Sequence, residues 1–224
     1  MLPVVARSLS HRYHPDPSSP PVLNAVDLTV SRGEFVILSG PTGSGKSTLL
    51  TLVGGLRRHQ QGVLQVLGRD LQDAAESTLV KLRREIGFIF QDHHLFDALT
   101  PRETLRLAMR LRSGYGARDY RERPTQWLTR VGLVTRMDAL PAALSTGQRQ
   151  CVAIARALIN EPSLILADEP AASLDATSAA IALDCLRAAA RERGAAVLMI
   201  THDSRHFARA DRVVQLLDGR VVPA

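Results

Sequence analysis

Apolar positions follow two different patterns along the chain, and each predicts a different kind of strand. Residues 22–30 place apolar side chains at nearly every second position, which is the period of a strand with one buried face, and residues 4–12 are a second candidate of this kind. Residues 35–38, 164–167 and 195–200 are continuously apolar, as in strands that are covered on both faces. We therefore predict an α/β fold with a mostly parallel core sheet and an N-terminal antiparallel β layer.

Helical spacing of apolar residues predicts the remaining elements. Residues 46–56, 76–85, 121–131 and 176–193 have this spacing, and the segments that begin at Thr100 and Ser145 carry the Ser/Thr-x-x-Glu/Gln start signal of a helix. The helix after Thr100 should run to about residue 112. Further strands are expected at 62–71 and 86–90, and the Asp-Gly pair at 218–219 predicts a final hairpin. Because residues 92–160 show no strand pattern, they are predicted to be a helical insert.

Length and composition indicate one globular domain. The chain has 224 residues, of which 45% are apolar and 22% charged, and no apolar run approaches the roughly 18 residues of a membrane span. Residues 1–10 lack the apolar core of a secretory signal, so we expect a cytoplasmic chain. Cys151 and Cys185 belong to no metal-binding pattern and are predicted to be small buried side chains.

The formal charge of +6 is spread along the chain and forms no binding patch. Arginines occur from Arg7 to Arg220 without a block of five, and Lys46 and Lys81 are the only lysines. A nucleic-acid-binding protein usually gathers its basic residues in a stripe. No nucleic-acid partner is therefore expected.

A glycine-rich segment joins the predicted strand before residue 40 to the helix at 46–56. It matches G-x-x-x-x-G-K-[ST], in which backbone N–H groups curl around phosphate oxygens and the helix N-terminus adds its positive dipole end. Lys46 would reach the β- and γ-phosphates, and the Ser47 hydroxyl would bind Mg²⁺. The predicted nucleotide-binding residues are Gly40, Pro41, Thr42, Gly43, Ser44, Gly45, Lys46, Ser47 and Thr48.

Two acidic residues end the apolar run at 164–167. Asp168 and Glu169 would lie at the carboxyl edge of a parallel sheet, where open α/β sheets bind ligands. Without a phosphate loop they would be two solvated acids at the end of a strand. With the loop present, Asp168 is a candidate metal ligand and Glu169 a candidate base that orients or deprotonates an attacking water.

Several further motifs, taken in order, resemble those of ABC transporter ATP-binding subunits. Gln91 is similar to the family's Q-loop glutamine, residues 144–148 to its signature loop, residues 173–175 to its D-loop and His202 to its switch histidine, and the resemblance extends from Tyr13 to His202. It implies a P-loop NTPase of the ABC ATPase type. Residues 1–224 would form a single domain, with a RecA-like core and the antiparallel layer at 1–91 and 161–224 and a helical subdomain at 92–160. The implied reaction is hydrolysis of ATP in the presence of Mg²⁺.

The resemblance also implies roles for three isolated residues. Tyr13 would stack on adenine, Gln91 would contact Mg²⁺ and the attacking water, and His202 would contact the γ-phosphate. Each residue also has a simpler interpretation, as a strand aromatic, an exposed polar side chain and a helix cap, respectively. The implied catalytic set is Lys46, Gln91, Glu169 and His202.

The signature loop predicts a second phosphate-binding site. Ser145 begins a predicted helix, so its hydroxyl, the Gly147 N–H and the helix dipole can bind an anion, with Gln148 beside them. A chain with one phosphate loop has no evident use for a second phosphate-binding site on the same nucleotide. The family arrangement is a head-to-tail homodimer with two ATP molecules at the interface. The alternative is that Ser145 only caps the helix.

Two residues depart from the family pattern. Thr146 stands where a second glycine is usual, and Cys151 where an arginine or another polar residue is common. Threonine would be strained at positive φ but is acceptable in the first turn of a helix. We therefore expect ATPase activity to survive this substitution.

Residues 52–56 and 86–95 look most like the lipoprotein-release, macrolide-export and DevA-type exporters. This likeness implies a separate integral membrane permease, whose short cytoplasmic helix would dock beside Gln91, and often a periplasmic adaptor reached through the permease. The chain would then act at the cytoplasmic face of the inner membrane.

Other classes of protein remain as alternatives. A cell-division regulator of the FtsE type would couple to a membrane partner that transports nothing. A soluble ABC ATPase of DNA repair or translation usually has two nucleotide domains or a coiled-coil insertion, and the sequence has neither. The enzyme-class alternative is a small-molecule kinase or a GTPase. The sequence contains no Asn-Lys-x-Asp segment of a GTPase, and the signature loop would have no role in either reaction.

Overall fold

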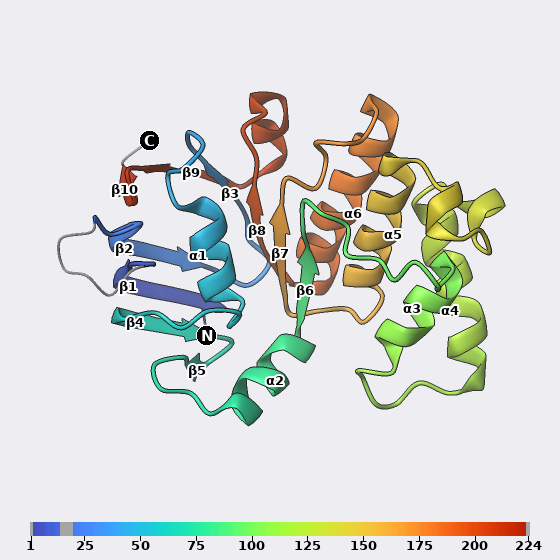
Figure 1. Cartoon of the computed structure of the whole chain (residues 1–224), viewed down its shortest axis with the longest axis horizontal. Coiled ribbons are helices and arrows are strands. Elements are labelled where there is room, and N and C mark those ends of the chain that lie inside the picture. The colour runs from blue at the N-terminus through green and yellow to red at the C-terminus, as the bar shows by residue number, and fades with distance from the viewer. Residues whose placement is uncertain (1, 14–19, 223–224) are drawn as a thin grey trace.

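The strands form two sheets of different type in the computed structural model, which describes residues 2–13 and 20–222 (Figure 1). One sheet has the order β10-β9-β3-β8-β7-β6, and all its neighbouring pairs are parallel except β9–β10. The other has the order β2-β1-β4-β5 and is antiparallel. The predicted fold class is therefore confirmed. The strands are β1 (Val4–His11), β2 (Leu23–Val30), β3 (Phe35–Ser39), β4 (Gln61–Val66), β5 (Arg69–Asp70), β6 (Ile86–Ile89), β7 (Leu164–Asp168), β8 (Ala196–Ile200), β9 (Arg212–Leu217) and β10 (Arg220–Val222).

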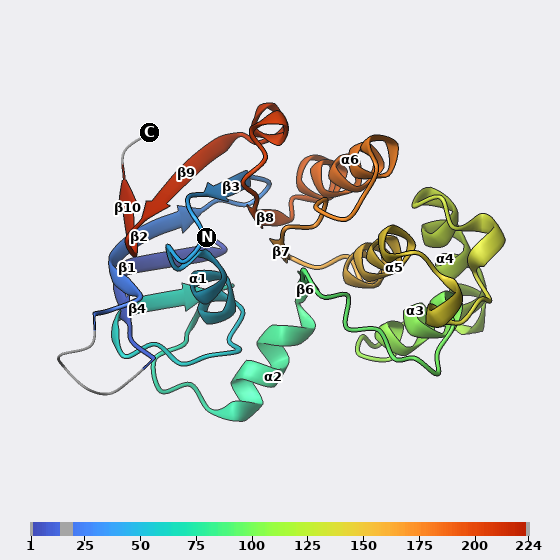
Figure 2. The same cartoon turned by 45° about the horizontal axis from the view of Figure 1, so that its top comes forward.

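The parallel sheet separates two hydrophobic cores. Successive residues of a strand point to opposite faces, so Phe35 and Ile37 of β3 enter one core while Val36 and Leu38 enter the other. The second core also contains side chains of the antiparallel sheet and of α1 (Lys46–Val53), which lies between the two sheets in both views (Figures 1 and 2). Because both faces are covered, the strands are continuously apolar in sequence.

The other face of the parallel sheet carries the remaining long helices. Helix α6 (Ala176–Arg193) contacts α5 and β8, and α5 (Thr146–Leu158) contacts β6. Helices α3 (Pro101–Met109) and α4 (Ala117–Arg130) pack on α5 at the far end from the antiparallel sheet (Figure 2). Helix α2 (Glu76–Arg84) precedes β6, and 3₁₀ turns occupy Val134–Arg136, Pro141–Ala143 and Ser204–Arg209. None of the described helices is long and apolar enough to cross a membrane.

Three helix boundaries differ from the prediction, each for a local reason. Helix α1 ends at Val53 rather than at residue 56, since Gly54 and Gly55 follow and Gly55 has φ +64°. Helix α4 begins four residues earlier than expected, at Ala117, because the Asp119 carboxylate accepts a hydrogen bond from the Gly116 N–H. Helix α3 ends at Met109 rather than near residue 112, because residues 110–112 form tighter bonds to the carbonyls three residues back.

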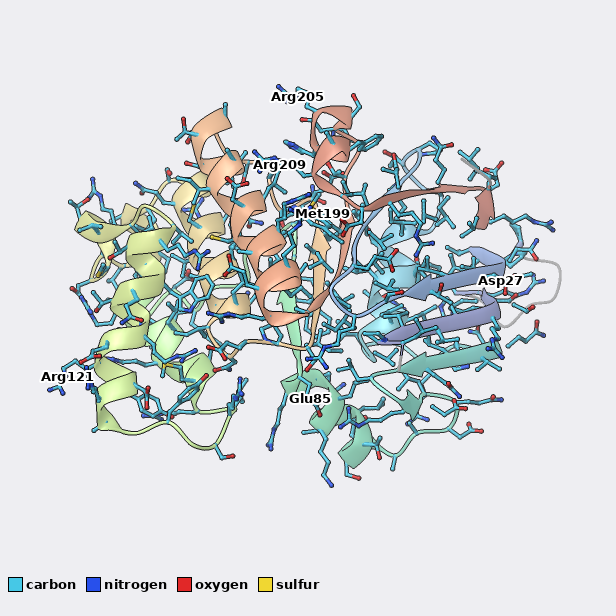
Figure 3. The ribbon with its side chains drawn as sticks, turned by 180° about the vertical axis from the view of Figure 1, so that it is seen from behind. Asp27, Glu85, Arg121, Met199, Arg205 and Arg209 are labelled. Carbon is cyan, nitrogen blue, oxygen red and sulfur yellow. The ribbon has the colours of Figure 1, made fainter. Side chains whose placement is uncertain are left out.

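The carboxyl ends of the parallel strands define one edge of the molecule. Seen from behind in Figure 3, Arg205 and Arg209, which follow β8, lie at this edge, whereas Glu85, which precedes β6, lies at the opposite one. Cys151 and Cys185 are both buried, as expected. The predicted catalytic residues lie at this carboxyl edge, at or just after the ends of the strands.

Candidate active site

Four neighbouring parallel strands bring the predicted catalytic segments to one edge. The glycine-rich loop at 40–45 follows β3, Gln91 lies two residues after β6, Asp168 ends β7 and is followed by Glu169, and His202 lies two residues after β8. Ile200, the last residue of β8, pairs with Asp168 at the end of β7 and with Leu38, the next-to-last residue of β3. Segments that are more than 160 positions apart in the sequence (40 to 202) therefore meet in space.

The glycine-rich loop adopts a path that side chains would obstruct. Gly40 has φ +144°, and a Cβ there would lie 2.1 Å from the Leu216 carbonyl oxygen. Gly45 has φ +99°, and its Cβ would lie 2.7 Å from the Val22 carbonyl oxygen. Gly45 also caps α1 without a side-chain hydrogen bond, so the first-turn N–H groups of α1 have no side-chain cap. The loop and the helix N-terminus are therefore a candidate anion site.

Backbone carbonyl groups of the loop hold the side chain of Lys46. Its Nζ atom donates hydrogen bonds to the carbonyl oxygens of Gly40 (2.8 Å) and Pro41 (2.7 Å), which places the ammonium group within the curve of the loop. The other predicted loop residues divide into exposed ones, Pro41, Thr42, Gly43 and Ser47, and buried ones, Ser44, Gly45 and Thr48; Gly40 and Lys46 are partly buried.

Ser47 and Asp168 form the candidate magnesium site. Their side chains are hydrogen-bonded, and burial raises the pKa of Asp168, although the Ser47 hydrogen bond and the nearby Lys46 lower it. A partly buried carboxylate beside a hydroxyl is a hard oxygen donor set of the kind that Mg²⁺ prefers, and a cation there would offset the cost of the partly desolvated charge. The residues therefore fit Mg²⁺. Gln91, the third predicted ligand, is exposed.

Glu169 is held by its backbone and by His202. Its φ is +47°, which is uncommon for a residue with a side chain, and its N–H donates to the Ile200 carbonyl oxygen at 3.1 Å. The His202 backbone N–H donates to Glu169 Oε1 at 3.2 Å, and His202 Nδ1 lies 2.7 Å from the same oxygen. The Glu169 side chain is 15% exposed and that of His202 is 76% exposed. A carboxylate fixed in this way is positioned to accept a proton from water at the sheet edge.

Tyr13 reaches the phosphate-loop helix although it lies outside the parallel sheet. Its hydroxyl is 2.8 Å from Oγ1 of Thr48 in α1, and its side chain is half-exposed. The structure therefore brings Tyr13, the glycine-rich loop, Asp168, Glu169 and His202 to one region of the chain.

The signature residues lie elsewhere. Ser145 caps α5 by accepting a hydrogen bond from the Gln148 N–H, and the Gln148 side chain accepts from the Ser145 N–H, as the start signal predicts. Thr146 is the first helical residue and has no positive φ, so threonine fits there without strain. Helices α1 and α5 lie on opposite sides of β7 and β8 (Figure 1), and no hydrogen bond in the described part of the chain joins Ser145 to the phosphate loop.

Two contacts of α5 were not anticipated from the sequence. The buried Gln150 side chain donates to the Pro170 carbonyl oxygen at 3.2 Å, one residue beyond Glu169. Arg156 donates to the carbonyl oxygens of His93 (3.0 Å) and His94 (2.6 Å), close after Gln91. Helix α5 therefore connects the signature loop to the segment after Glu169 and to the segment after Gln91. A polar residue at a core position of a helix, as at Gln150, is the signal that could have indicated this contact.

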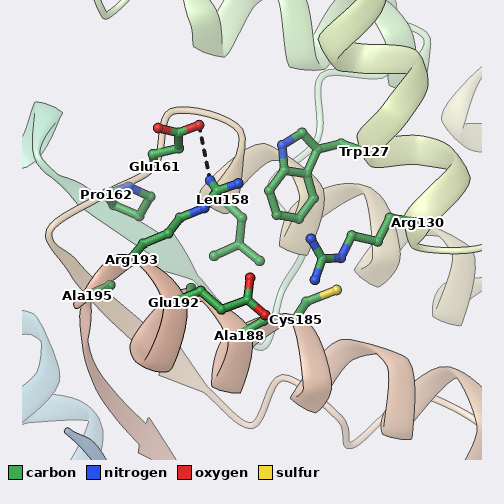
Figure 4. A pocket seen from close by; sticks show the side chains of 11 residues that line it. Trp127, Arg130, Leu158, Glu161, Pro162, Cys185, Ala188, Glu192, Arg193 and Ala195 are labelled. Carbon is green, nitrogen blue, oxygen red and sulfur yellow. Dashed lines mark ion pairs between the residues drawn. The ribbon is translucent and has the colours of Figure 1, made fainter. Parts of the chain in front are cut away.

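An apolar groove lies beside the Gln91 segment, between β6 and α3. It has a volume of about 550 Å³. Its lining includes Phe96, Leu107 and Leu111, which are 63%, 40% and 57% exposed. Arg84 and Arg110 are also in its lining. A second hollow, beside Cys185 and Trp127, encloses only about 10 Å³, which is too little for a ligand (Figure 4).

The comparisons with known proteins agree with this geometry. The family model described as "ABC transporter" matches residues 23–172. The chain belongs to the ABC transporter ATP-binding family. This ABC ATPase is 42% identical over 219 residues to the lipoprotein-releasing system ATP-binding protein LolD 1 of Caulobacter vibrioides, with 97% of this chain and 94% of the relative covered. It is 44% identical over 211 residues to LolD of Anaeromyxobacter dehalogenans, with 94% and 88% covered.

Other relatives extend the comparison. The putative hemin import ATP-binding protein HrtA of Staphylococcus haemolyticus is 42% identical over 201 residues, with 89% of this chain and 90% of the relative covered. The solved dimeric, post-hydrolysis structure of the ATP-binding cassette MJ0796, bound to ADP and Pi, has a TM-score of 0.92 at 33% identity, with 98% of this chain and 97% of that chain covered. This ABC ATPase therefore hydrolyses ATP, and its ligands are ATP and Mg²⁺.

Proposed function

We propose that this ABC ATPase drives a separate membrane permease of the lipoprotein-release, macrolide-export or DevA type. The observation that carries the proposal is the exposed apolar groove beside the Gln91 segment, next to a complete set of phosphate-loop and base residues. The LolD proteins of Caulobacter vibrioides and Anaeromyxobacter dehalogenans, which match nearly the whole chain, support the choice of permease class. In such a system the chain works at the cytoplasmic face of the inner membrane, and a periplasmic adaptor is reached only through the permease.

The occupant of the groove is a short amphipathic cytoplasmic helix of the permease. Its apolar side would cover Phe96, Leu107 and Leu111, whose exposure leaves an apolar surface of the kind that marks interaction sites. No hydrogen bond or ion pair is found for the Arg84 and Arg110 side chains within the described residues, so acidic groups on the docking helix would complement the groove. Charge complementarity of this kind fixes register and specificity.

The proposed reaction uses the residues at the sheet edge. The phosphate loop and Lys46 would bind the triphosphate, and Tyr13 would stack on the base. Ser47 and Asp168 would hold Mg²⁺, which would supply positive charge to the phosphates. Glu169 accepts the proton of the attacking water, and His202 holds the carboxylate in place and faces the γ-phosphate. Gln91 links this centre to the groove.

The second half of the site comes from another copy of the chain. Ser145, Gly147 and Gln148 form a helix N-terminus that is not joined to the phosphate loop of the same chain. In a head-to-tail homodimer this N-terminus would face the γ-phosphate bound by the partner, so that two ATP molecules are enclosed between the two copies. The dimeric MJ0796 cassettes support this arrangement.

Co-expression with a candidate permease of the lipoprotein-release, macrolide-export or DevA type from the same genome tests the proposal. Leu111→Glu places a charge in the groove and should abolish co-purification of the permease while basal ATPase activity stays within about twofold of wild type. Val134→Glu is the matched control, because Val134 is similarly exposed, at 58%, but is not among the groove residues. Co-purification of Leu111→Glu at the wild-type level would contradict the assignment of the groove.

A further inference from the structure

The tyrosine proposed to receive the nucleotide base is fixed by a short segment that follows α1. Residues 54–60 connect α1 to β4, and three of the contacts of the Tyr13 segment come from this connection or from α1 itself. The glycine-rich motif does not include these residues. The contacts of this connecting segment with Arg12 and Tyr13 indicate a role in positioning the tyrosine.

Gln60 extends the β1–β4 ladder with its side chain. Its Oε1 accepts from the Arg12 N–H at 2.9 Å, and its Nε2 donates to the Arg12 carbonyl oxygen at 2.8 Å. The amide thus makes both bonds that a paired strand residue would make, directly after the last backbone pair of β1 and β4, Ser10 with Gln61. The backbone immediately before Tyr13 is therefore fixed.

The Tyr13 ring is held from three directions. Its hydroxyl is 2.8 Å from Thr48 Oγ1, the Arg57 guanidinium lies over one face at 4.8 Å from the ring centroid, and His11 meets it edge-on at 5.5 Å. His11 is 5% exposed, and burial and the nearby Arg57 lower its pKa, so a neutral imidazole lies beside the guanidinium. The ring keeps half of its surface exposed.

We propose that Arg57 is a positioning residue for nucleotide binding: its guanidinium covers one face of Tyr13, with Gln60 fixing the adjacent backbone, and leaves the opposite face for the base of ATP. This inference rests on the proposed role of Tyr13 as the base platform. A ring fixed before binding loses little further entropy when the base stacks on it. Arg57 acts through Tyr13 and does not touch the triphosphate.

Calorimetric titration of the purified chain in EDTA, where no Mg²⁺-dependent hydrolysis occurs, tests the proposal with two probes, ATP and inorganic tripolyphosphate. Arg57→Ala should weaken ATP binding about two- to fivefold, the scale of an exposed cation–π contact, and leave tripolyphosphate binding unchanged. Arg57→Lys should retain most of the ATP affinity. Arg58→Ala is the matched control, since Arg58 carries the same charge and is bonded to the Ala74 carbonyl oxygen, and it should change neither affinity. Turnover at saturating ATP with Mg²⁺ should be the same in all three variants.

Equal weakening of ATP and tripolyphosphate by Arg57→Ala would overturn the proposal, because Arg57 would then act as a charge near the phosphates. Unchanged or tighter ATP binding would also overturn it, the latter because Arg57 would then compete with the base. Tyr13→Ala distinguishes failure of the role proposed for Arg57 from failure of the role proposed for Tyr13. It should weaken ATP about fivefold or more without affecting tripolyphosphate, and an unchanged ATP affinity in this variant would refute the base platform itself.

Discussion

Replacing Glu169 by glutamine isolates its role as a base. The amide has the same shape, its oxygen can still accept from the His202 N–H, and the positive φ at this position suits glutamine as well as glutamate. The substitution therefore removes the negative charge and the proton-accepting capacity and little else. A positioned base contributes about 10²–10⁴-fold, so turnover should fall by this factor, equivalent to about 2.7–5.4 kcal/mol in the activation free energy.

Phosphate release at saturating ATP and Mg²⁺ measures this effect, and calorimetry measures ATP affinity, which should stay within about threefold of wild type. Glu122→Gln on α4 is a suitable control, because within the described residues Glu122 pairs only with Arg118 of the same helix and lies outside the catalytic edge. Turnover of Glu169→Gln within a fewfold of wild type would refute the assignment of the base.

Three further substitutions test other parts of the site. Lys46→Ala should weaken ATP binding at least about tenfold in calorimetry, because the ammonium makes charge-assisted bonds; binding at the wild-type level would contradict its role. Asp168→Asn should abolish Mg²⁺-dependent turnover yet raise Tm at pH 7. Burial raises the pKa of Asp168 in the folded state. Ionisation of Asp168 therefore destabilises the folded state at pH values above the pKa of the unfolded chain, about 3.9, and removing the charge should stabilise it. A lower Tm for Asp168→Asn would contradict this direction. Gly40→Ala places a Cβ 2.1 Å from a carbonyl oxygen at φ +144° and should cost about 2 kcal/mol or more of unfolding free energy in urea titration, whereas a cost below about 0.5 kcal/mol would show that the loop adjusts.

Much of the fold could be predicted because its elements carry local signals. Strands such as β8, which are buried on both faces, are continuously apolar. The Ser/Thr-x-x-Glu/Gln start signals at Thr100 and Ser145 correspond to capping hydrogen bonds that the structure contains. Helix ends were less predictable. The end of α3 depends on a change of hydrogen-bond spacing, and the start of α4 depends on the Asp119 side chain bonding to Gly116, which outweighs apolar periodicity.

The candidate site was predictable where one segment contains the whole feature. The glycine-rich loop and the acidic pair are contiguous in sequence, and the parallel-sheet rule places both at the carboxyl edge. The contacts of Gln150 with Pro170 and of Arg57 with Tyr13 are set by packing between distant segments. The sequence shows Gln150 as a polar residue at a core position of a helix, but it does not identify the partner of Gln150 or of Arg57. The strand order, which places β8 between β3 and β7, is also set by packing between distant segments.

We propose that ATP is enclosed between two copies of this chain, bound by the phosphate loop of one and the Ser145 helix N-terminus of the other. Light scattering of Glu169→Gln during gel filtration, with ATP and Mg²⁺, tests it most directly. We expect twice the mass of one chain with nucleotide and the mass of a single chain without it. When Ser145→Arg is added, we expect a single chain even with nucleotide. A Glu169→Gln chain that stays monomeric at saturating ATP, or a dimer that forms equally well with Ser145→Arg, would contradict it.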